Sequence, residues 1–117
     1  MDNARATELL AAERARVTDE LSRLEAEFRP DASDTAAEEI TAGDGAVDIT
    51  ERTRDLERID ALRLELAAVE RAETRLAEGT YGISIDSGEP ISDARLERIP
   101  TAERTADEQR EFERLGG

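Results

Sequence analysis

The sequence predicts a mainly α-helical protein, built as a long antiparallel two-helix coiled-coil hairpin followed by a small base with a C-terminal helix. Two long stretches carry apolar residues at alternating three- and four-residue steps, which places these residues on one seam of each helix. A glycine-rich segment separates the two stretches. Only Phe28, Tyr81 and Phe112 are aromatic among 117 residues, and 39% of residues are charged. A thick globular core is therefore not expected.

The first predicted helix runs from Asp2 to Arg29, a segment without glycine or proline. Its apolar seam is interrupted by polar Arg14. The seam consists of Leu10, Val17, Leu21, Leu24 and Phe28. Pro30 disfavours helix at the residue before it, and a short helical segment is expected over residues 33–40.

A turn is predicted at residues 41–45, because two glycines and an Asp tolerate positive φ angles. The second helix is expected to begin near Asp48, Ile49 or Thr50, with Asp48 and Glu51 spaced as in a capping box. Its seam, with Glu73 as the polar interruption, consists of Leu56, Ile59, Leu62, Leu66, Val69 and Leu76. Gly79 is expected to end this helix as a C′ residue.

The charge pattern excludes several classes of function. A net charge of −14 argues against direct binding to a nucleic-acid backbone, so the expected partner is a protein. The chain has neither Cys nor His, which removes disulfides, thiolate chemistry and the usual zinc ligands. No apolar run reaches membrane-spanning length, and the first ten residues are polar and acidic. We expect a monomeric, cytoplasmic protein without membrane contact.

Most turn-forming residues of the C-terminal part lie in residues 81–109, which read YGISIDSGEPISDARLERIPTAERTADEQ. A turn is predicted around Gly88, and Ser92 is expected to cap a short helical turn that ends at Pro100. Thr101 or Thr105 is expected to begin a final helix that runs to about Leu115. A small apolar core is expected from Ile83, Ile85, Ile91, Leu96, Ile99 and Phe112.

This stretch, written Y-G-x-S-x-x-S-G-x-x-I-x-x-x-R-L-x-x-x-P-x-A-x-x-T-x-x-E-Q, resembles the four-cysteine zinc knuckle of the DksA/TraR family. The four ligand positions of that family fall on Ser84, Ser87, Thr105 and Glu108. Three hydroxyls and one carboxylate are a poor donor set for Zn²⁺, so we expect no zinc. Ser84 and Ser87 can instead bind backbone groups of the turn, and Thr105 with Glu108 can form a capping box. We expect apolar burial and capping to replace the metal.

The resemblance also implies the organisation and function of the whole chain. The hairpin would occupy residues 1–79, with its tip near residues 41–48, and the base would occupy residues 80–117. The acidic tip motif of the family, D-x-x-D-x-A, falls on Thr41, Asp44 and Ala46, of which Asp44 and Ala46 match. Members of the family bind RNA polymerase, insert the tip through the secondary channel and change the stability of promoter complexes without DNA contact. The resemblance therefore implies a transcription regulator without catalytic residues, with Asp44 as its main functional residue.

The sequence leaves alternatives for the role of Asp44 and for the function of the chain. Asp44 beside glycine could be only a turn former. The chain could be a coiled-coil interaction or scaffold module that kept the fold, and the least favoured alternative is an enzyme with Mg²⁺ held at an acidic tip.

The family's binding positions for the nucleotide ppGpp fall on Ala68, Ile99 and Gln109, which carry no cation, so a weak or absent ppGpp response is predicted. Arg95 and Arg98 remain nearby as contacts to the polymerase rim.

Overall fold

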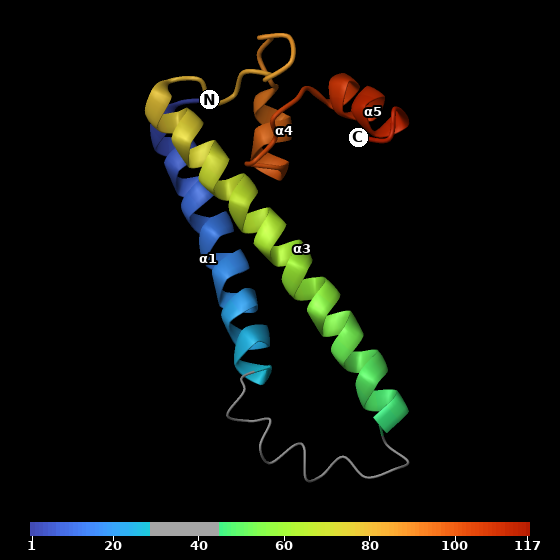
Figure 1. Ribbon diagram of the computed structural model, residues 1–117. Helices are drawn as coiled ribbons and strands as arrows, with labels where there is room; N and C mark the ends of the chain where they lie inside the picture. Colours follow the sequence, from blue (N-terminus) through green and yellow to red (C-terminus); the bar gives the residue numbers. More distant parts are fainter. Residues whose placement is uncertain (29–44) are drawn as a thin grey trace. The chain divides into compact units, whose positions relative to one another are not determined.

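The computed structural model describes residues 1–28 and 45–117, and of residues 45–48 the backbone alone. The described residues form four helices, α1 (Asn3–Glu27), α3 (Gly45–Glu78), α4 (Asp93–Arg98) and α5 (Ala106–Arg114) (Figure 1). Outside these helices the described part contains one isolated antiparallel bridge, between Ile83 and Pro90. The mainly α-helical prediction is confirmed. The helical segment predicted over residues 33–40 lies outside the described residues, and so does the turn predicted at residues 41–45 except for Gly45, which begins α3.

The chain divides into two compact units, and the boundaries between them fall inside both long helices. The coil unit comprises residues 16–66, and the base unit comprises residues 1–15 and 67–117. The division differs from the predicted boundary after residue 79, because the first turns of α1 and the last turns of α3 pack with the C-terminal segment. None of the described helices is long and apolar enough to cross a membrane.

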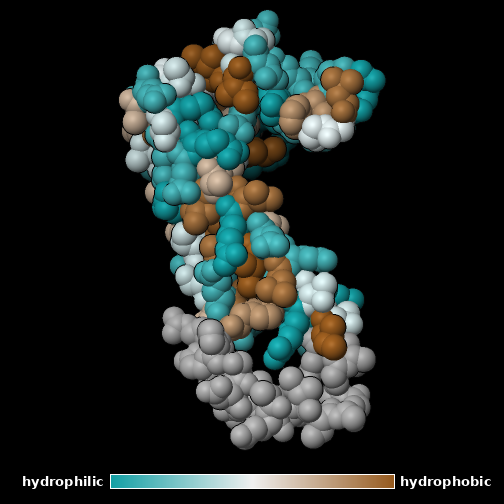
Figure 2. All heavy atoms as spheres, in the orientation of Figure 1, coloured by the Kyte–Doolittle hydropathy of each residue, from teal (hydrophilic) through white to brown (hydrophobic). Residues whose placement is uncertain are grey.

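The coil unit is held by the predicted seam between α1 and α3. Its core consists of Val17, Leu21, Ile59 and Leu62, against which Leu24, Phe28 and Leu66 pack. Figure 2 shows hydrophobic side chains gathered where the two helices meet. The prediction that Leu56 extends this seam is wrong, because Leu56 is 50% exposed. The seam continues instead through Asp55, which lies one helical turn before Ile59 and is half-buried.

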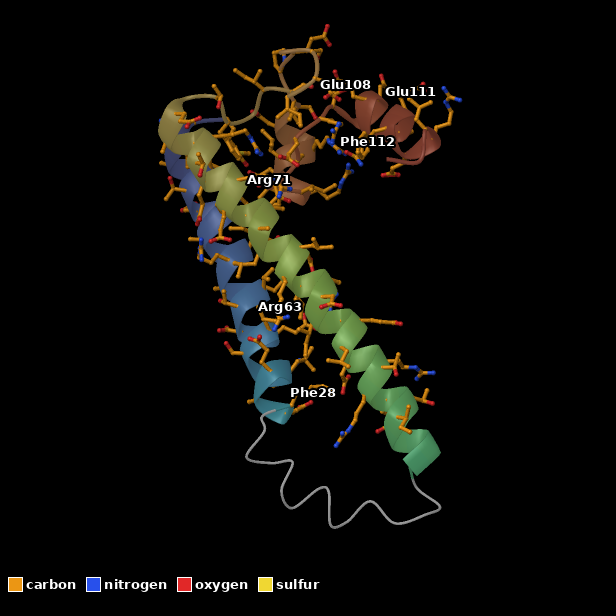
Figure 3. All side chains as sticks on the ribbon, in the orientation of Figure 1. Phe28, Arg63, Arg71, Glu108, Glu111 and Phe112 are labelled. Carbon is orange, nitrogen blue, oxygen red and sulfur yellow. The ribbon has the colours of Figure 1, made fainter. Side chains whose placement is uncertain are left out.

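Three ion pairs join α1 to α3 beside this core: Arg16–Glu65, Glu20–Arg58 and Glu25–Arg63. The Arg58 pair is bidentate, with nitrogen–oxygen distances of 2.9 and 2.8 Å to Glu20, and its hydrogen bonds hold the pKa of Glu20 below its usual range. Arg63, labelled on α3 in Figure 3, donates to Glu25 at 2.6 Å. Because all of these side chains except the half-buried Glu20 are largely exposed, the pairs contribute little to stability, and their role is to favour one register between the helices.

The C-terminal end of α3 agrees with the prediction, whereas its N-terminal end does not. The helix begins at Gly45, so the expected start near residues 48–50 is wrong and Asp48 lies within the helix instead of capping it. Residues 46–78 contain no glycine or proline, which lets the helix extend back to Gly45. At the other end Gly79 has a φ of 83°, and the N–H groups of Gly79 and Thr80 donate to the carbonyls of Leu76 and Arg75 at 3.3 and 2.8 Å. This is the predicted glycine C′ end.

In the base unit, α1 and α3 bury small and apolar residues: Ala6, Leu10, Val69 and Ala72. The polar residues that interrupt the two predicted seams pair with each other here. Arg14 binds Glu73 through two hydrogen bonds of 3.0 and 2.6 Å, and the bonded Arg14 holds the pKa of Glu73 below its usual range. Each interruption of the apolar pattern is therefore matched by an opposite charge on the facing helix.

The C-terminal part of the base unit has a smaller core than predicted. Ile91, Leu96 and Ala102 are buried, with Tyr81 packed against them. The prediction was wrong for Ile83, Ile85, Ile99 and Phe112, which are 37–50% exposed. Ser84 is buried between Ile83 and Ile85, and successive side chains of an extended segment point to opposite sides, so both isoleucines point outward. Helix α5 has no buried residue, and the Phe112 ring lies 3.8 Å from the Arg104 guanidinium.

Candidate functional site

The first two positions of the knuckle pattern lie in a tight turn of residues 84–89, the serine turn, which the side chains of Ser84 and Ser87 stabilise. The Ser84 oxygen accepts hydrogen bonds from the backbone N–H groups of Asp86 and Ser87 at 3.1 and 3.2 Å. The Ser87 oxygen accepts from the N–H of Glu89 at 3.2 Å. Gly88 completes the turn with a φ of 77°, a value that favours glycine. The predicted backbone-binding role of both serines is confirmed.

The other two positions begin α5. The Thr105 oxygen accepts from the N–H of Glu108 at 3.2 Å, and the Glu108 carboxylate accepts from the N–H of Thr105 at 2.9 Å. These reciprocal bonds are the predicted capping box. The expected alternative start at Thr101 is wrong, because Thr101 precedes the helix by a full turn and Thr105 occupies the N-cap.

The Glu108 carboxylate, labelled in Figure 3, lies in the first turn of α5, where it accepts the Thr105 N–H. Nearby polar groups, first the Ser87 hydroxyl and then the Thr105 backbone, lower the pKa of Glu108 to about 2. Hydrogen bonds to an ionised carboxylate favour the charged form, which accounts for the direction of this shift.

This arrangement does not fit a zinc ion. Zinc in structural sites is bound by thiolate and imidazole ligands, and three of the four positions here are neutral hydroxyls. Both serine oxygens already accept backbone hydrogen bonds. Within residues 1–28 and 45–117 no group of three or more His, Cys, Asp or Glu could hold a metal ion.

A second charged cluster ties the segment before α5 to α3. The Glu103 carboxylate accepts from Arg71 at 3.1 and 3.2 Å and from Arg75 at 3.0 Å. Burial raises the pKa of Glu103, but the hydrogen bond and charge of Arg71 and the charge of Arg75 outweigh burial, so this pKa lies below its usual range. The backbone of Glu103 also accepts from the N–H of Ile85 at 2.9 Å. Glu103 thus connects the serine turn, the segment before α5 and α3.

Helix α4 is attached to the rest of the base unit from both sides. Arg5 of α1 binds Glu97 with hydrogen bonds of 2.8 and 2.5 Å. The Tyr81 hydroxyl donates to the carbonyl of buried Pro100 at 2.8 Å. These contacts hold α4 to α1 and fasten the segment that follows α4 to Tyr81.

The structure places the remaining predicted site residues as follows. The Arg95 Nε donates to the carbonyl of Arg104 at 2.9 Å, and Arg98 is exposed one turn further along α4. Thr41 and Asp44 lie outside the described residues. Ala46 lies in the first turn of α3, and its side chain is outside the described part.

Sequence reasoning missed the pairing of Arg14 with Glu73 and the binding of Arg71 and Arg75 to Glu103. Arg71 and Arg75 are spaced to lie on one face of a helix, which is a signal of a shared acidic partner. The partner itself could not be identified, because Glu103 follows Arg75 by 28 residues that include α4.

Comparisons with known proteins agree with this fold. Residues 79–114 match a family profile described as "Prokaryotic dksA/traR C4-type zinc finger". The chain is 37% identical over 71 residues to the protein named "RNA polymerase-binding transcription factor DksA" in two strains of Caulobacter vibrioides, a match that covers 61% of this chain and 50% of each relative. The chain thus spans about half the length of the curated relatives it matches. The solved structure of transcription factor DksA2 from Pseudomonas aeruginosa is similar in fold, with a TM-score of 0.67 at 24% identity over 97% of this chain and 81% of that chain.

Proposed function

The chain belongs to the DksA/TraR family, and on this premise we propose that it is a transcription regulator that binds RNA polymerase. In this proposal the coiled-coil tip enters the secondary channel of the polymerase and alters the stability of promoter complexes. The protein contacts no DNA, acts as a cytoplasmic monomer and has no catalytic activity of its own.

The observation that carries the proposal is the 37% identity with relatives named as RNA polymerase-binding transcription factors. The fold supports it, because a DksA2-like architecture extends over 97% of the chain although no cysteine is present. The net charge of −14 also supports a protein partner over a nucleic-acid backbone, which is itself an anion.

Within the tip we propose Asp44 as the functional residue, supported by Ala46, while Thr41 replaces the first acid of the family motif. A carboxylate brought close to the Mg²⁺ ions and basic side chains of a polymerase site interacts strongly, because water is largely excluded there. The role needs a charge at the end of a hairpin and no catalytic group.

In the base we propose Arg98 as the rim contact. Its side chain is exposed on α4, whereas the Nε of Arg95 already binds the Arg104 carbonyl. Ala68, Ile99 and Gln109 offer no cation to a phosphate, so the proposed regulator responds weakly or not at all to ppGpp. Titration of ppGpp into a transcription assay tests this, and a marked enhancement that depends on the protein would contradict it.

The decisive binding experiment is capture of core RNA polymerase by the purified chain, repeated in competition with a known secondary-channel binder. We expect capture that the competitor abolishes. Capture that survives saturating competitor would place the binding surface elsewhere on the polymerase. Absence of capture would support the alternative, a coiled-coil scaffold module that kept the family fold.

The tip is tested by Asp44→Asn, which preserves the turn-forming side chain and removes its charge. We expect the variant to bind polymerase as the unmodified chain does and to lose most of the effect on promoter complexes. Asp34→Asn, which removes an acid from the same part of the sequence, is the matched control and should change neither property. An unchanged transcription effect in Asp44→Asn with binding retained would exclude the charge role.

A further inference from the structure

Helix α5 lacks the buried residues that hold the other described helices in place. It has nine residues and none of them is buried, and an isolated helix of this length is marginal in water. The side-chain bonds of Glu108 with Thr105 and of Gln109 with Glu113 run within the helix or to the residue before it. They stabilise the helix and do not fix its position. Burial within α5 and its capping box therefore do not account for how the helix is held in the base unit.

The Arg104 side chain contacts both α5 and the serine turn. Its guanidinium lies 3.8 Å from the centre of the Phe112 ring on α5, a residue labelled in Figure 3. Its Nε donates to the carboxylate of Asp86, which precedes it by 18 residues, at 2.8 Å. One cation therefore joins two segments that are separate in the sequence.

The Arg104 guanidinium and the Phe112 ring are both held in position. The carbonyl of Arg104 accepts from the Arg95 Nε at 2.9 Å, and the Arg104 side chain is only 15% exposed. A Cβ placed on Gly117 would lie 2.6 Å from carbon atoms of the Phe112 ring, so the backbone of Gly117 packs closely against the ring. The attraction between a cation and an aromatic ring increases when the cation is removed from water. The contact of Arg104 with Phe112 is therefore stronger than one between exposed side chains.

This arrangement differs from a surface ion pair. An ion pair between solvent-exposed side chains contributes little to stability, and the pair of Arg110 with Asp107 in α5 is of this kind, with exposed fractions of 74% and 88%. Arg104 is largely buried, and its guanidinium lies against a ring as well as a carboxylate. Loss of Arg104 should therefore affect α5 more than loss of Arg110.

We propose that the Arg104 guanidinium is the cation that fastens α5 to the serine turn, through Phe112 and Asp86, and that it takes the structural place of a metal ion. In a four-cysteine site the zinc ion joins its ligands through one central cation. The corresponding segments here are the serine turn and the start of α5. The arginine clasp, defined as Asp86, Arg104 and Phe112, contains neither metal nor thiol, so chelators leave α5 attached. The inference concerns the folding of the base unit and does not rest on polymerase binding.

Replacement of Arg104 tests the arginine clasp. Arg104→Ala removes the whole side chain, whereas Arg104→Leu keeps apolar bulk and removes the cation with its donors. Residue 104 lies outside the described helices, so neither change acts through helix propensity. Arg110→Ala is the matched control, because it removes an arginine from α5 itself and Ala is a good helix former.

The readout is amide hydrogen exchange in the full-length chain. In both Arg104 variants we expect the amides of Gln109 and Leu115, which form backbone hydrogen bonds of 2.9 and 3.1 Å at the two ends of α5, to exchange about tenfold faster or more. The amide of buried Ile91 should keep its protection, which shows that the rest of the base unit is folded. Arg110→Ala should accelerate none of these amides. Unchanged exchange of Gln109 and Leu115 in Arg104→Ala, or protection restored by Arg104→Leu, would overturn the proposal.

A measurement on chains that retain Arg104 keeps the proposal testable if its replacement prevents folding. The Phe112 ring should shift the NMR signals of the Arg104 side-chain protons upfield, and Phe112→Leu, a change at a residue that is 37% exposed, should remove the shift. Absence of the shift in the unmodified chain would overturn the arginine clasp. Asp86→Asn should weaken the shift, because the guanidinium loses its charged acceptor. An unchanged shift in Asp86→Asn would contradict the link to the serine turn.

Discussion

Replacement of Leu62 by Ala is the most direct test of how the coil unit is stabilised. Leu62 is 0% exposed and packs with Val17, Leu21 and Ile59. Truncation of a fully buried leucine costs about 2–5 kcal/mol, the larger values arising where the surrounding structure cannot close the gap. A seam between two helices is one layer thick and can partly collapse, so we expect about 2–3 kcal/mol.

The same helix provides the control. Leu64 lies two residues further along α3 and is 73% exposed, so Leu64→Ala removes the same atoms without opening a cavity. We expect its free energy of unfolding to change by less than about 0.5 kcal/mol, because Ala is also at least as good a helix former as Leu.

The assay is thermal and urea unfolding followed by the helical circular dichroism signal. Leu62→Ala should lower the midpoint temperature by an amount on the order of 10 °C, and Leu64→Ala should leave it nearly unchanged. Similar losses in both variants would mean that the packing of α1 against α3 is not what holds the coil unit together.

Two further variants test the base unit. Tyr81→Phe removes the hydroxyl that binds the Pro100 carbonyl, and leaving that acceptor unpaired should cost about 1 kcal/mol in urea unfolding; no measurable loss would mean that water replaces the hydroxyl. Gly79→Ala should cost about 1 kcal/mol, because the φ of 83° is unfavourable for Ala although its Cβ would meet nothing within 4 Å. A Gly79→Ala chain as stable as the original would show that the end of α3 relaxes.

The local features of this fold could be predicted from the sequence. The spacing of apolar residues in α1 identified the buried Val17 and Leu21, and the Thr105 capping box needs only residues within one turn of each other. Such features depend on a few neighbouring residues, which is why short-range rules describe them.

The features that could not be predicted depend on residues that are far apart in the sequence. The expected burial of Ile83 and Ile85 failed because Ser84, and not its apolar neighbours, points inward. Whether a residue of a short extended segment points inward depends on which side faces the rest of the base unit, and no periodicity reveals this. The serine hydroxyls were expected to bind backbone groups, and they do, because those partners lie within three residues in the sequence.

The ion pairing between the two long helices also depends on residues that are far apart in the sequence. Arg14 and Glu73 could be recognised as interruptions of two apolar seams, but their pairing depends on the register between α1 and α3. A shift of the register would separate the pair and leave each charge beside apolar side chains. The interruptions therefore help to specify one alignment of the hairpin.

In the proposed function a metal-free base supports binding to RNA polymerase. The most direct measurement is the affinity for core polymerase of the purified chain after treatment with a strong chelator and removal of the chelator, compared with the untreated chain. We expect saturable binding at one chain per polymerase, with the same affinity before and after treatment. Loss of binding on chelation would contradict the metal-free base, and absence of binding in both samples would contradict the proposed function.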